Sequence, residues 1–487
     1  MEDLLLKSEY NNDGSVGDIV LATDFYELTM AAAYLYYSFD KANRRRKNKG
    51  IFEMFVRKLP RNRSYLVAAG LEQAIYFLMK MKFNDRQISY LKSLKVFKHL
   101  NQNFFEYLKN FKFTGTVWSV PEGTILFPNE PIIRIEAPII EAQIVETYIL
   151  SMINFQSLIA TKASRIVSAA KGKSIIEFGS RRAHGPQAAL LAARASYIGG
   201  CIGTSNTLAG YRFKIPLFGT MAHSFVMTFD KEEDAFKQFN SVLPSGYLLV
   251  DTYDSIAAIK KIINAGIQAN GIRLDSGDLY YQSIEARRLL DHAGYSNTKI
   301  MASGDLNEYL IRDLVKRGAP IDSFGVGTEL STSRDDPAMN GVYKLVAIRV
   351  SRSLQPPPLS NKKKNHHEDD NDNDKILYKL KTSPGKKTYP GPKQIYRILE
   401  NSIIRKDIVT LEDEGAPDDS GIPLLRKFFD KGKVLCKMPS MKEIQKHHLQ
   451  QLILLPHKFK DLDFVPEAFP VIYSRKLRKI YNTEIQS

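Results

Sequence analysis

Between residues 170 and 330, short apolar runs alternate with longer segments in which apolar residues recur at helical spacing. The apolar runs have the length of buried strands, and several of the intervening segments end in glycine, as helices tend to do. This alternation predicts βαβ units and a parallel sheet. Six strands are expected, at residues 174–179, 216–223, 247–253, 271–276, 299–305 and 323–330. Such a series predicts a barrel, or a fold close to one, with its functional groups at the carboxyl ends of the strands.

The pattern differs on the N-terminal side of this region. Residues 19–110 are expected to form helices with short strands, including a strand at 51–59. Residues 114–140 alternate between apolar and polar side chains and are interrupted by proline and glycine, which is typical of a small β-rich module. Residues 141–170 have the apolar face of a long amphipathic helix. The chain is therefore expected to combine two kinds of architecture.

A chain of 487 residues is too long for one ordinary core, so two domains are expected. We predict an N-terminal α+β domain at residues 16–145, completed by part of residues 376–487, and an α/β barrel catalytic domain at residues 146–350. Residues 351–375 contain prolines followed by blocks of basic and acidic residues, and almost nothing that could build a core. This composition predicts a disordered surface insertion. The segment after it, 376–487, is expected to pack on both domains.

The composition is that of a soluble globular protein, with 44% apolar and 25% charged residues. The two cysteines, Cys201 and Cys436, exclude a disulfide framework and fit a reducing compartment. The first residues lack the basic start of a signal peptide, and no run reaches the roughly 18 apolar residues of a membrane-spanning helix. A cytoplasmic protein without a membrane partner is therefore expected.

The net charge of +16 can attract nucleic acid, an anionic membrane or small anionic molecules. The basic residues are spread over the whole chain, and neither a metal-finger spacing nor an aromatic ribonucleoprotein strand accompanies them. We therefore expect no nucleic-acid partner. A non-catalytic basic protein that binds nucleic acid is the remote alternative.

Polar residues and glycines gather where five of the predicted strands end. They are Arg181, Arg182 and His184; Thr220 and His223; Arg273, Asp275, Ser276 and Asp278; Ser303, Gly304 and Asp305; and Gly325, Gly327 and Thr328. In a parallel barrel these residues converge on one rim. Arginines bind carboxylate or phosphate, and glycine turns bind phosphate through backbone N–H groups. The residue types predict an anionic ligand, and Asp275 and Asp305 suit sugar hydroxyls or a Mg²⁺ ion carried by a diphosphate.

His223 stands in the apolar run GTMAHSFVM, with hydroxyls near it at Thr220 and Ser224. From the run alone, a buried histidine whose ring is satisfied by a carbonyl is the favoured interpretation. The other interpretation is chemical, because a neutral imidazole is a competent nucleophile near neutral pH. The residues by themselves leave both interpretations open.

Seven segments resemble, in order, motifs of the nicotinate phosphoribosyltransferases, which are type II phosphoribosyltransferases. They are TDFYELTM (23–30), FVRKLPRNRSYLVAAGLEQ (55–73), EFGSRRAHGPQAA (177–189), GTMAHSF (219–225), GIRLDSGDL (271–279), FGVGTEL (324–330) and KTSPGKKTYPG (381–391). They extend over about three quarters of the chain. The resemblance implies an irregular α/β barrel of the type II phosphoribosyltransferase kind, together with an α+β domain built from N- and C-terminal segments.

The resemblance also implies a reaction. Nicotinate and 5-phosphoribosyl diphosphate give nicotinate mononucleotide and pyrophosphate, the first step of NAD synthesis from nicotinate, and ATP hydrolysis is coupled to it through a transient phosphohistidine. The residue that matches this histidine is His223, which favours the chemical interpretation of its imidazole. The implied cofactors are Mg²⁺ (or Mn²⁺) and ATP as co-substrate.

The resemblance also implies roles for individual residues that match the motifs of the family. His223, Arg273 and Asp275 are implied as catalytic. The implied substrate contacts are Tyr26 and Phe178 on the faces of the pyridine ring, Arg273 and Thr220 at its carboxylate, Arg181 at base and phosphate, Gly304, Gly327 and Thr328 at the 5-phosphate, and Asp275 and Asp305 at ribose and magnesium. Arg57, Lys344, Lys379 and Lys386 resemble positions that gather phosphates of the substrate or of ATP.

Family members commonly pair head-to-tail, so a homodimer with active sites near the subunit interface is implied. Tyr26 or Arg57 would then serve the active site of the neighbouring subunit. Transfer to nicotinamide or quinolinate is the alternative within the superfamily. An aldolase or dehydrogenase barrel is disfavoured, because neither a strand-end Schiff-base lysine nor a G-x-G-x-x-G turn is found where it is needed.

Overall fold

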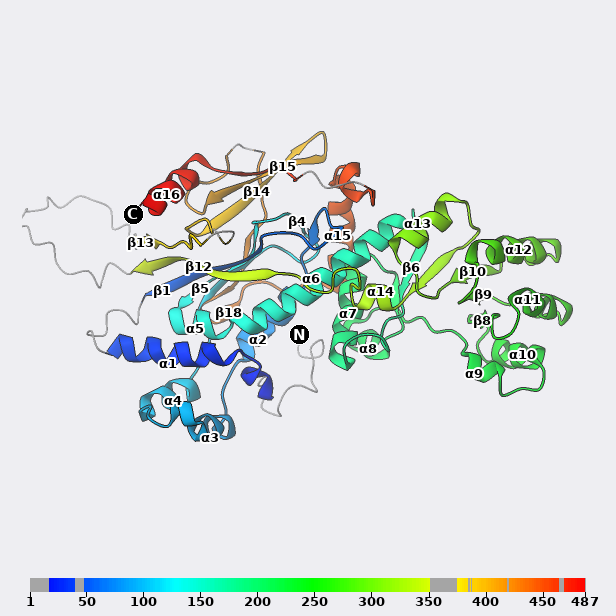
Figure 1. Cartoon of the computed structure of the whole chain (residues 1–487), viewed down its shortest axis with the longest axis horizontal. Coiled ribbons are helices and arrows are strands. Elements are labelled where there is room, and N and C mark those ends of the chain that lie inside the picture. The colour runs from blue at the N-terminus through cyan, green and yellow to red at the C-terminus, as the bar shows by residue number, and fades with distance from the viewer. Residues whose placement is uncertain are drawn as a thin grey trace, which may run out of the picture.

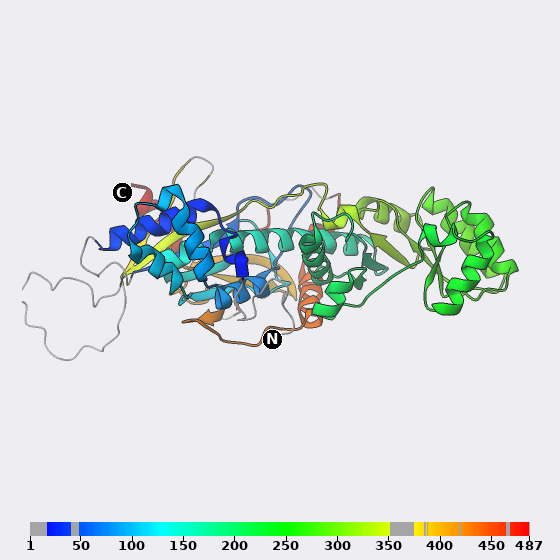
Figure 2. The same cartoon turned by 90° about the horizontal axis from the view of Figure 1, so that it is seen from below.

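The computed structural model describes residues 17–39, 48–350, 375–383, 386, 388–417, 420–463 and 468–486. The insertion predicted at 351–375 lies outside the described residues, except for Lys375. The described chain is elongated, with two packed regions along its length (Figure 1, Figure 2). Each region has its own hydrophobic core.

One region contains the parallel sheet that the alternating pattern predicts. Its strands, in pairing order, are β7 (Gly203–Thr204), β6 (Ser174–Glu177), β11 (Ser323–Val326), β10 (Lys299–Ala302), β9 (Gly271–Leu274) and β8 (Tyr247–Leu249). All neighbouring pairs are parallel. Five of the predicted strands contain one of these strands. Each is shorter than predicted at its carboxyl end, because the polar residues there belong to loops.

Helices lie between these strands in the chain, as predicted. They are α7 (Pro186–Ile198), α8 (Thr207–Phe213), α10 (Glu232–Val242), α11 (Ser255–Asn264), α12 (Leu279–His292) and α13 (Glu308–Lys316), and one more, α14 (Thr328–Ser331), follows the last strand. Their apolar side chains join the same core as the strands.

The strand predicted at 216–223 is wrong. Pro216 has no N–H to donate to a ladder, and an isolated bridge between Thr204 and Leu217 is the β-pairing that the structure records for this segment. His223 is instead the first residue of the short helix α9 (His223–Val226). The apolar run therefore has the composition of a strand without its geometry.

Residues 216–222, which we call the seam, nevertheless close the sheet. On one edge Thr204 N donates to Pro216 O and Phe218 N donates to Thr204 O, both at 3.0 Å. On the other edge Met221 N donates to Tyr247 O of β8 at 3.5 Å. Because β7 and β8 are the two outer strands of the sheet, the seam joins them and completes an irregular barrel.

The other region is built on a seven-stranded antiparallel sheet. Its order is β13 (Lys375–Tyr378), β12 (Gly341–Val350), β1 (Lys49–Val56), β5 (Pro131–Pro138), β3 (Thr116–Ser119), β17 (Arg426–Asp430) and β18 (Lys433–Val434). A four-stranded sheet and a strand pair accompany it: β16 (Ile422–Pro423), β14 (Lys393–Glu400), β15 (Ile403–Leu411) and β19 (Val471–Tyr473), and β2 (Leu66–Val67) with β4 (Ile125–Leu126). Segments from both ends of the chain thus build one region.

Strand β12 differs from the predicted domain boundary. The prediction places residues up to 350 in the barrel domain, but β12 pairs with the whole of β1 in the seven-stranded sheet. Its Tyr343 is buried in the core of that region and stacks on Phe52 at 4.9 Å between ring centroids. The chain therefore leaves the barrel before β12, because the apolar face of this strand is buried against β1.

Helices complete the region that holds the seven-stranded sheet. They are the 3₁₀ helices η2 (Gly17–Leu21) and η4 (Lys95–Phe97), followed by α1 (Phe25–Phe39), α2 (Leu71–Lys80), α3 (Asp85–Ser93), α4 (Gln102–Lys109), α5 (Ile139–Ile144) and α16 (Arg475–Gln486). The buried apolar residues of α15 (Met441–Leu454) and η6 (His457–Lys460) belong instead to the barrel core. Within the described part of the chain, no helix combines the length and apolar character needed to cross a membrane.

The long helix predicted at 141–170 is α6 (Glu146–Ala169), and it connects the two regions (Figure 1). Ile149 lies in the core of the seven-stranded sheet, whereas Ile166 lies in the barrel core. Between them, Lys162 is fully buried, with its Nζ 2.6 Å from Glu308 and 2.9 Å from Asp335. A buried lysine between two carboxylates fixes the helix against the loops that follow β10 and β11, because separating the charges would leave them unpaired.

Helix α15 packs on both regions through a buried histidine. His448 Nε2 lies 2.9 Å from Ser164 Oγ on α6, and its Nδ1 lies 3.2 Å from Gly123 O. Tyr65 extends the network, with its hydroxyl 2.7 Å from Ser164 Oγ. Burial lowers the pKa of His448 to about 4, so the fold keeps this imidazole neutral.

This network predicts a loss of stability in mild acid. The His448 pKa is lower in the folded state than in the unfolded chain, so its contribution is fully present above about pH 6.5 and is lost as the pH falls toward 4. We expect the free energy of unfolding to fall by about 1 kcal/mol through this group between about pH 7.5 and about pH 5.5. Urea denaturation of the wild type and of His448→Gln at both pH values measures the difference. The exposed His99→Gln is the control, and an equal pH dependence in all three proteins would contradict the assignment.

Candidate active site

A cavity of about 350 Å³ opens where the barrel strands end. It is lined by the residues after β6 and β7, by the seam, by the start of α9 and by the tips of β8 and β9. Of the predicted site residues, the structure brings together Phe178, Arg181, Thr220, His223, Arg273 and Asp275. The expected convergence of strand tips therefore places aromatic, cationic, anionic and nucleophilic groups around one space.

Arg273, on β9, is held from three sides. Its Nε donates to Ser303 Oγ at 2.8 Å, one Nη donates to Thr220 Oγ1 at 2.7 Å, and the other donates to Asp275 Oδ1 at 2.6 Å. Its guanidinium carbon lies 5.7 Å from the ring centroid of Phe178. A guanidinium has five N–H donors, so two remain for a ligand. The geometry suits a flat ring that carries a carboxylate.

Phe178 is positioned by the buried carboxylate of Glu177, which the sequence analysis did not select. Glu177 accepts from the backbone N–H of Gly179 and from Thr204 Oγ1, the latter at 2.5 Å. Burial raises the pKa of this carboxyl. Asn206 N donates to the same Thr204 hydroxyl at 2.9 Å. One carboxylate thus ties together the turns that form two walls of the cavity, and the sequence gives no signal for it beyond its place at a strand end.

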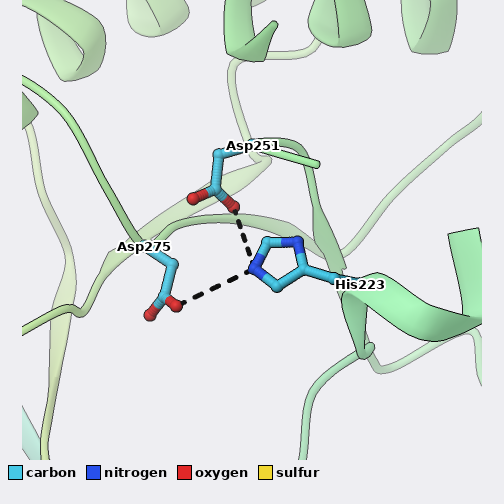
Figure 3. Close-up of side chains that lie close together, drawn as sticks. All are labelled: His223, Asp251 and Asp275. Carbon is cyan, nitrogen blue, oxygen red and sulfur yellow. Dashed lines mark ion pairs between the residues drawn. The ribbon is translucent and has the colours of Figure 1, made fainter. Parts of the chain in front are cut away.

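His223 is accessible from the cavity, with 43% of its side chain exposed. Its Nδ1 lies 3.1 Å from Thr252 Oγ1. Its Nε2 faces two carboxylates, Asp251 and Asp275, with an oxygen of each at 4.0 Å (Figure 3). A buried histidine satisfied by a carbonyl, the interpretation favoured by the apolar run alone, does not describe this ring.

Asp251 was not among the predicted site residues, although it also follows a barrel strand, β8. Its side chain is 4% exposed, and its Oδ2 accepts from Ser276 Oγ at 2.6 Å. Its Oδ1 is buried and has no hydrogen-bond partner in the described part of the chain. The same strand-end rule that selected Asp275 would have found it.

The carboxylates of Asp251 and Asp275 fit a divalent cation. One oxygen of each and a ring nitrogen of His223 lie within 4.8 Å of one another. Carboxylate oxygens are the ligands that Mg²⁺ prefers, and Mg²⁺ usually keeps several waters or substrate oxygens beside one or two carboxylates. Asp305, the other predicted metal contact, is exposed and is not part of this group.

The predicted phosphate-binding residues lie in loops at neighbouring strand tips. Gly304 follows β10 with φ +95°, and a Cβ there would lie 2.0 Å from Asp275 O, so only glycine fits. Gly327 precedes α14, and a Cβ on it would lie 3.2 Å from Phe178 O. Thr328 is the first residue of α14. These turns therefore approach the backbone beside Asp275 and Phe178, although they do not line the cavity itself.

The other predicted residues lie in the region of the seven-stranded sheet. Tyr26, on α1, is 46% exposed and donates its hydroxyl to Glu146 at 2.8 Å. Figure 1 shows α1 and β12 toward one end of the molecule and α9 toward the other. Tyr26 is not among the residues that line the cavity with Phe178.

A basic cluster, consisting of Arg57, Lys344, Lys381 and Lys386, lies in the same region. One Nη of Arg57 donates to Lys386 O at 3.4 Å. Burial, together with the positive charges of the other three residues, lowers the pKa of Lys344. Such a concentration of cations favours a bound anion. Lys379 stands near these residues in sequence, and its backbone N–H donates to Val346 O.

Comparison with protein-family models gives three matches along the chain. Residues 21–154 match the nicotinate phosphoribosyltransferase N-terminal domain, residues 159–335 match the quinolinate phosphoribosyl transferase C-terminal domain, and residues 419–481 match the nicotinate phosphoribosyltransferase C-terminal domain. Together these models cover both structural regions.

Curated relatives match over nearly the whole chain. The chain is 39% identical to nicotinate phosphoribosyltransferase pncB2 of Mycobacterium tuberculosis over 464 residues, covering 94% of this chain and 92% of the relative. It is also 39% identical to nicotinate phosphoribosyltransferase of Bacillus subtilis over 498 residues, covering 95% and 96%. The chain belongs to the nicotinate phosphoribosyltransferase family.

Solved structures agree with this assignment. Human nicotinic acid phosphoribosyltransferase superposes with a TM-score of 0.77 at 25% identity, covering 95% of this chain and 99% of that chain. Nicotinate-nucleotide pyrophosphorylase of Pyrococcus furiosus, at 24% identity, shares the fold, with a TM-score of 0.68 over 91% and 97% of the two chains. The predicted fold, an irregular barrel of the type II phosphoribosyltransferase kind with an α+β region, is confirmed.

Proposed function

We propose that this protein transfers the phosphoribosyl group of 5-phosphoribosyl diphosphate to nicotinate, giving nicotinate mononucleotide and pyrophosphate. The names of its relatives support the reaction. The observation that carries the choice of base is the guanidinium of Arg273 beside the ring of Phe178, with N–H groups left for a carboxylate. Nicotinate combines the flat ring and the carboxylate that these two groups suit.

The pyridine ring lies against Phe178 in this proposal, and Arg273 binds its carboxylate. Thr220 and Asp275 hold the guanidinium in place, so binding does not have to immobilise a free arginine. Arg181 also lines the cavity and adds positive charge near the base and its phosphate. The 5-phosphate of the sugar binds at the turns of Gly304, Gly327 and Thr328.

In the transfer step, the lone pair of the pyridine nitrogen attacks C1 of the ribose. The bond between C1 and the diphosphate oxygen breaks, and its electron pair leaves with pyrophosphate. The transition state has oxocarbenium character, as in other glycosyl transfers. Asp251 and Asp275 would hold Mg²⁺, which would neutralise part of the charge of the leaving diphosphate. The chain contributes mainly by holding the base and the sugar in the orientation that this attack requires.

ATP hydrolysis is coupled to this step through His223 in our proposal. When Nδ1 carries the ring proton and donates a hydrogen bond to Thr252 Oγ1, Nε2 is unprotonated and its lone pair faces the cavity. Nε2 attacks the γ-phosphorus of ATP, the bond to the β–γ bridging oxygen breaks, and ADP leaves. Water later hydrolyses the phosphohistidine to phosphate. The phosphorylated His223 places negative charge beside Asp251 and Asp275. This charge favours binding of the magnesium-bound substrate and later helps to expel pyrophosphate.

A homodimer completes the site in this proposal. Tyr26 and most of the basic cluster belong to the functional set by resemblance, yet none of these residues lines the cavity, and α1 and β12 lie toward the opposite end of the molecule from α9 (Figure 1). A head-to-tail partner would place its own Tyr26 over the free face of the pyridine ring and its basic cluster at the diphosphate. The cations would then serve where charge develops in the transition state.

The first prediction from the proposed function concerns base specificity. The wild-type protein, assayed with 5-phosphoribosyl diphosphate, Mg²⁺ and ATP, is expected to form the mononucleotide from nicotinate in preference to nicotinamide and quinolinate. Arg273→Gln should lower kcat/KM for nicotinate by about a hundredfold, because a paired charge-assisted contact is lost. The exposed Arg182→Gln is the matched control. Preference for another base by the wild type would refute the proposed substrate.

The second prediction concerns the phosphohistidine. His223→Ala should retain slow transfer that ATP does not accelerate, and it should lose ATP hydrolysis, because the phosphoryl acceptor is absent. Radiolabel from γ-labelled ATP should appear as an acid-labile protein adduct in the wild type but not in His223→Ala. His184→Ala, also exposed near a strand tip, serves as control. Equal stimulation by ATP of His223→Ala and the wild type would exclude this role.

The third prediction tests the shared active site. Tyr26→Ala and Arg273→Gln should each be nearly inactive alone. Subunit exchange between them produces mixed dimers with one intact site, so the mixture should recover about a quarter of wild-type activity by statistical pairing. Activity is measured before and after exchange at equal total protein. No recovery, with exchange verified by mass labelling, would mean that each chain builds its own site.

A further inference from the structure

A second cavity, of about 460 Å³, lies in the region of the seven-stranded sheet and shares no lining residue with the active site. Its walls come from β1, β14, β19 and α16, which are elements from both ends of the chain. Its volume falls in the range of small-molecule sites in proteins. The function proposed above assigns no role to this cavity.

One wall of this cavity is a buried ion pair. Lys393 Nζ lies 2.7 Å from Glu53 Oε2, and it also donates to Gly391 O at 2.9 Å. The other oxygen of Glu53 accepts from the backbone N–H of Lys393 at 2.8 Å. Burial lowers the pKa of Lys393. Because the two charges satisfy each other, this wall is polar but offers no unmet charge.

Another wall contains a hydroxyl without a partner. Thr388 lines the cavity and is 3% exposed, and its Oγ1 is buried with no hydrogen bond to any described residue. Buried hydroxyl groups in native proteins are normally paired. An unpaired one in the wall of a cavity of this size offers a hydrogen bond to a molecule that enters the cavity.

The aromatic residues of the cavity form a column of rings. Tyr389 stacks on Tyr473 at 3.9 Å between centroids, with planes 16° apart, and the ring of Tyr481 is tilted against Tyr389, with centroids 4.5 Å apart and planes at 31°. All three rings line the cavity, so a flat ligand there meets aromatic surface, to which it is well suited.

Cations of the basic cluster lie beside the aromatic wall. Phe55 lines the cavity, and the guanidinium carbon of Arg57 lies 5.5 Å from its ring centroid. Arg57 Nε is buried and unpaired among the residues that the structure describes. Lys386, which accepts from Arg57 through its carbonyl, stands two positions before Thr388. A ligand that fills the cavity can therefore extend an anionic group toward these cations.

From these contacts we propose that the second cavity binds a nucleotide. Its heteroaromatic base lies against the tyrosine column with a polar edge bonded to Thr388 Oγ1, and its phosphate points toward Arg57 and Lys386. The basic cluster is also the group that the proposed function assigns to the diphosphate of the neighbouring active site. Resting on that function, occupancy of the cavity weakens binding of 5-phosphoribosyl diphosphate, so the cavity is a regulatory site.

Equilibrium dialysis of the full-length protein with radiolabelled AMP, and separately with radiolabelled nicotinate mononucleotide, tests the binding. Both measurements use the Arg273→Gln protein, because this substitution impairs binding of the nucleotide base in the active-site cavity. One of the two nucleotides should bind, and Thr388→Val should weaken that binding about tenfold through the lost hydrogen bond. Thr410→Val, a buried threonine bonded to Leu411 O, is the matched control. The nucleotide that binds identifies the base as a purine or a pyridine.

Failure of both nucleotides to bind, or equal affinity in Thr388→Val and Thr410→Val, would overturn the proposal. If Thr388→Val does not fold, Tyr481→Ala at the outer end of the ring column replaces it, with the same expected loss. Kinetics then separate this inference from the proposed function. In the wild type, the bound nucleotide should raise the KM for 5-phosphoribosyl diphosphate, and Thr388→Val should relieve that effect. A protein that makes no mononucleotide from any base refutes the proposed function, yet it leaves the binding measurement intact.

Discussion

The barrel side of this protein depends on the hydrogen bonds that the seam makes along its two edges. Residues 216–222 join β7 to β8, and without them the parallel sheet would end in two open edges. The same segment carries Thr220, which holds Arg273, and delivers His223 to the mouth of the barrel. Closure of the fold and assembly of the site are therefore one structural event. An irregular segment can do this because its side chains need not alternate between two faces as those of a strand must.

Behind the site, the loops that follow the strands are anchored from the side of α6. Glu308, just after the loop of Gly304, pairs with Lys162 and Arg165 of this helix. Asp335, after α14, pairs with Lys162 and with Arg63. These groups are mostly buried, and buried pairs resist separation because each charge would be left unpaired. The turns proposed to bind phosphate are thus held by a helix that also belongs to the core of the other region, which links the integrity of the site to the packing of both.

The two regions divide the chemistry between them. The barrel gathers the groups that suit the base and the reacting sugar, whereas the sheet region gathers cations that suit phosphates. In one chain the elements that carry these sets lie apart (Figure 1), which is why the proposed function brings them together from two copies of the chain. The cations stand beside the second cavity as well. An anion bound on either side of Arg57 draws on the same positive charge, which is a physical basis for coupling the two sites.

The sequence by itself determined the parallel strands and the helices between them, because buried strands and amphipathic helices leave periodic patterns that do not depend on distant contacts. It also determined that Arg273, Asp275, Phe178 and Arg181 would meet, since parallel strands align their carboxyl ends. It did not give the true geometry of the apolar run at 216–223, whose composition is that of a strand. Asp251 and Glu177 also stand at strand ends, where the rule that selected Asp275 applies, but the groups that they bind were visible only in the structure. Their roles arise from partners far away in sequence, such as Ser276 and Thr204. The separation of Tyr26 from Phe178 was likewise decided by tertiary structure, because distance in space between two folded regions leaves no trace in local patterns.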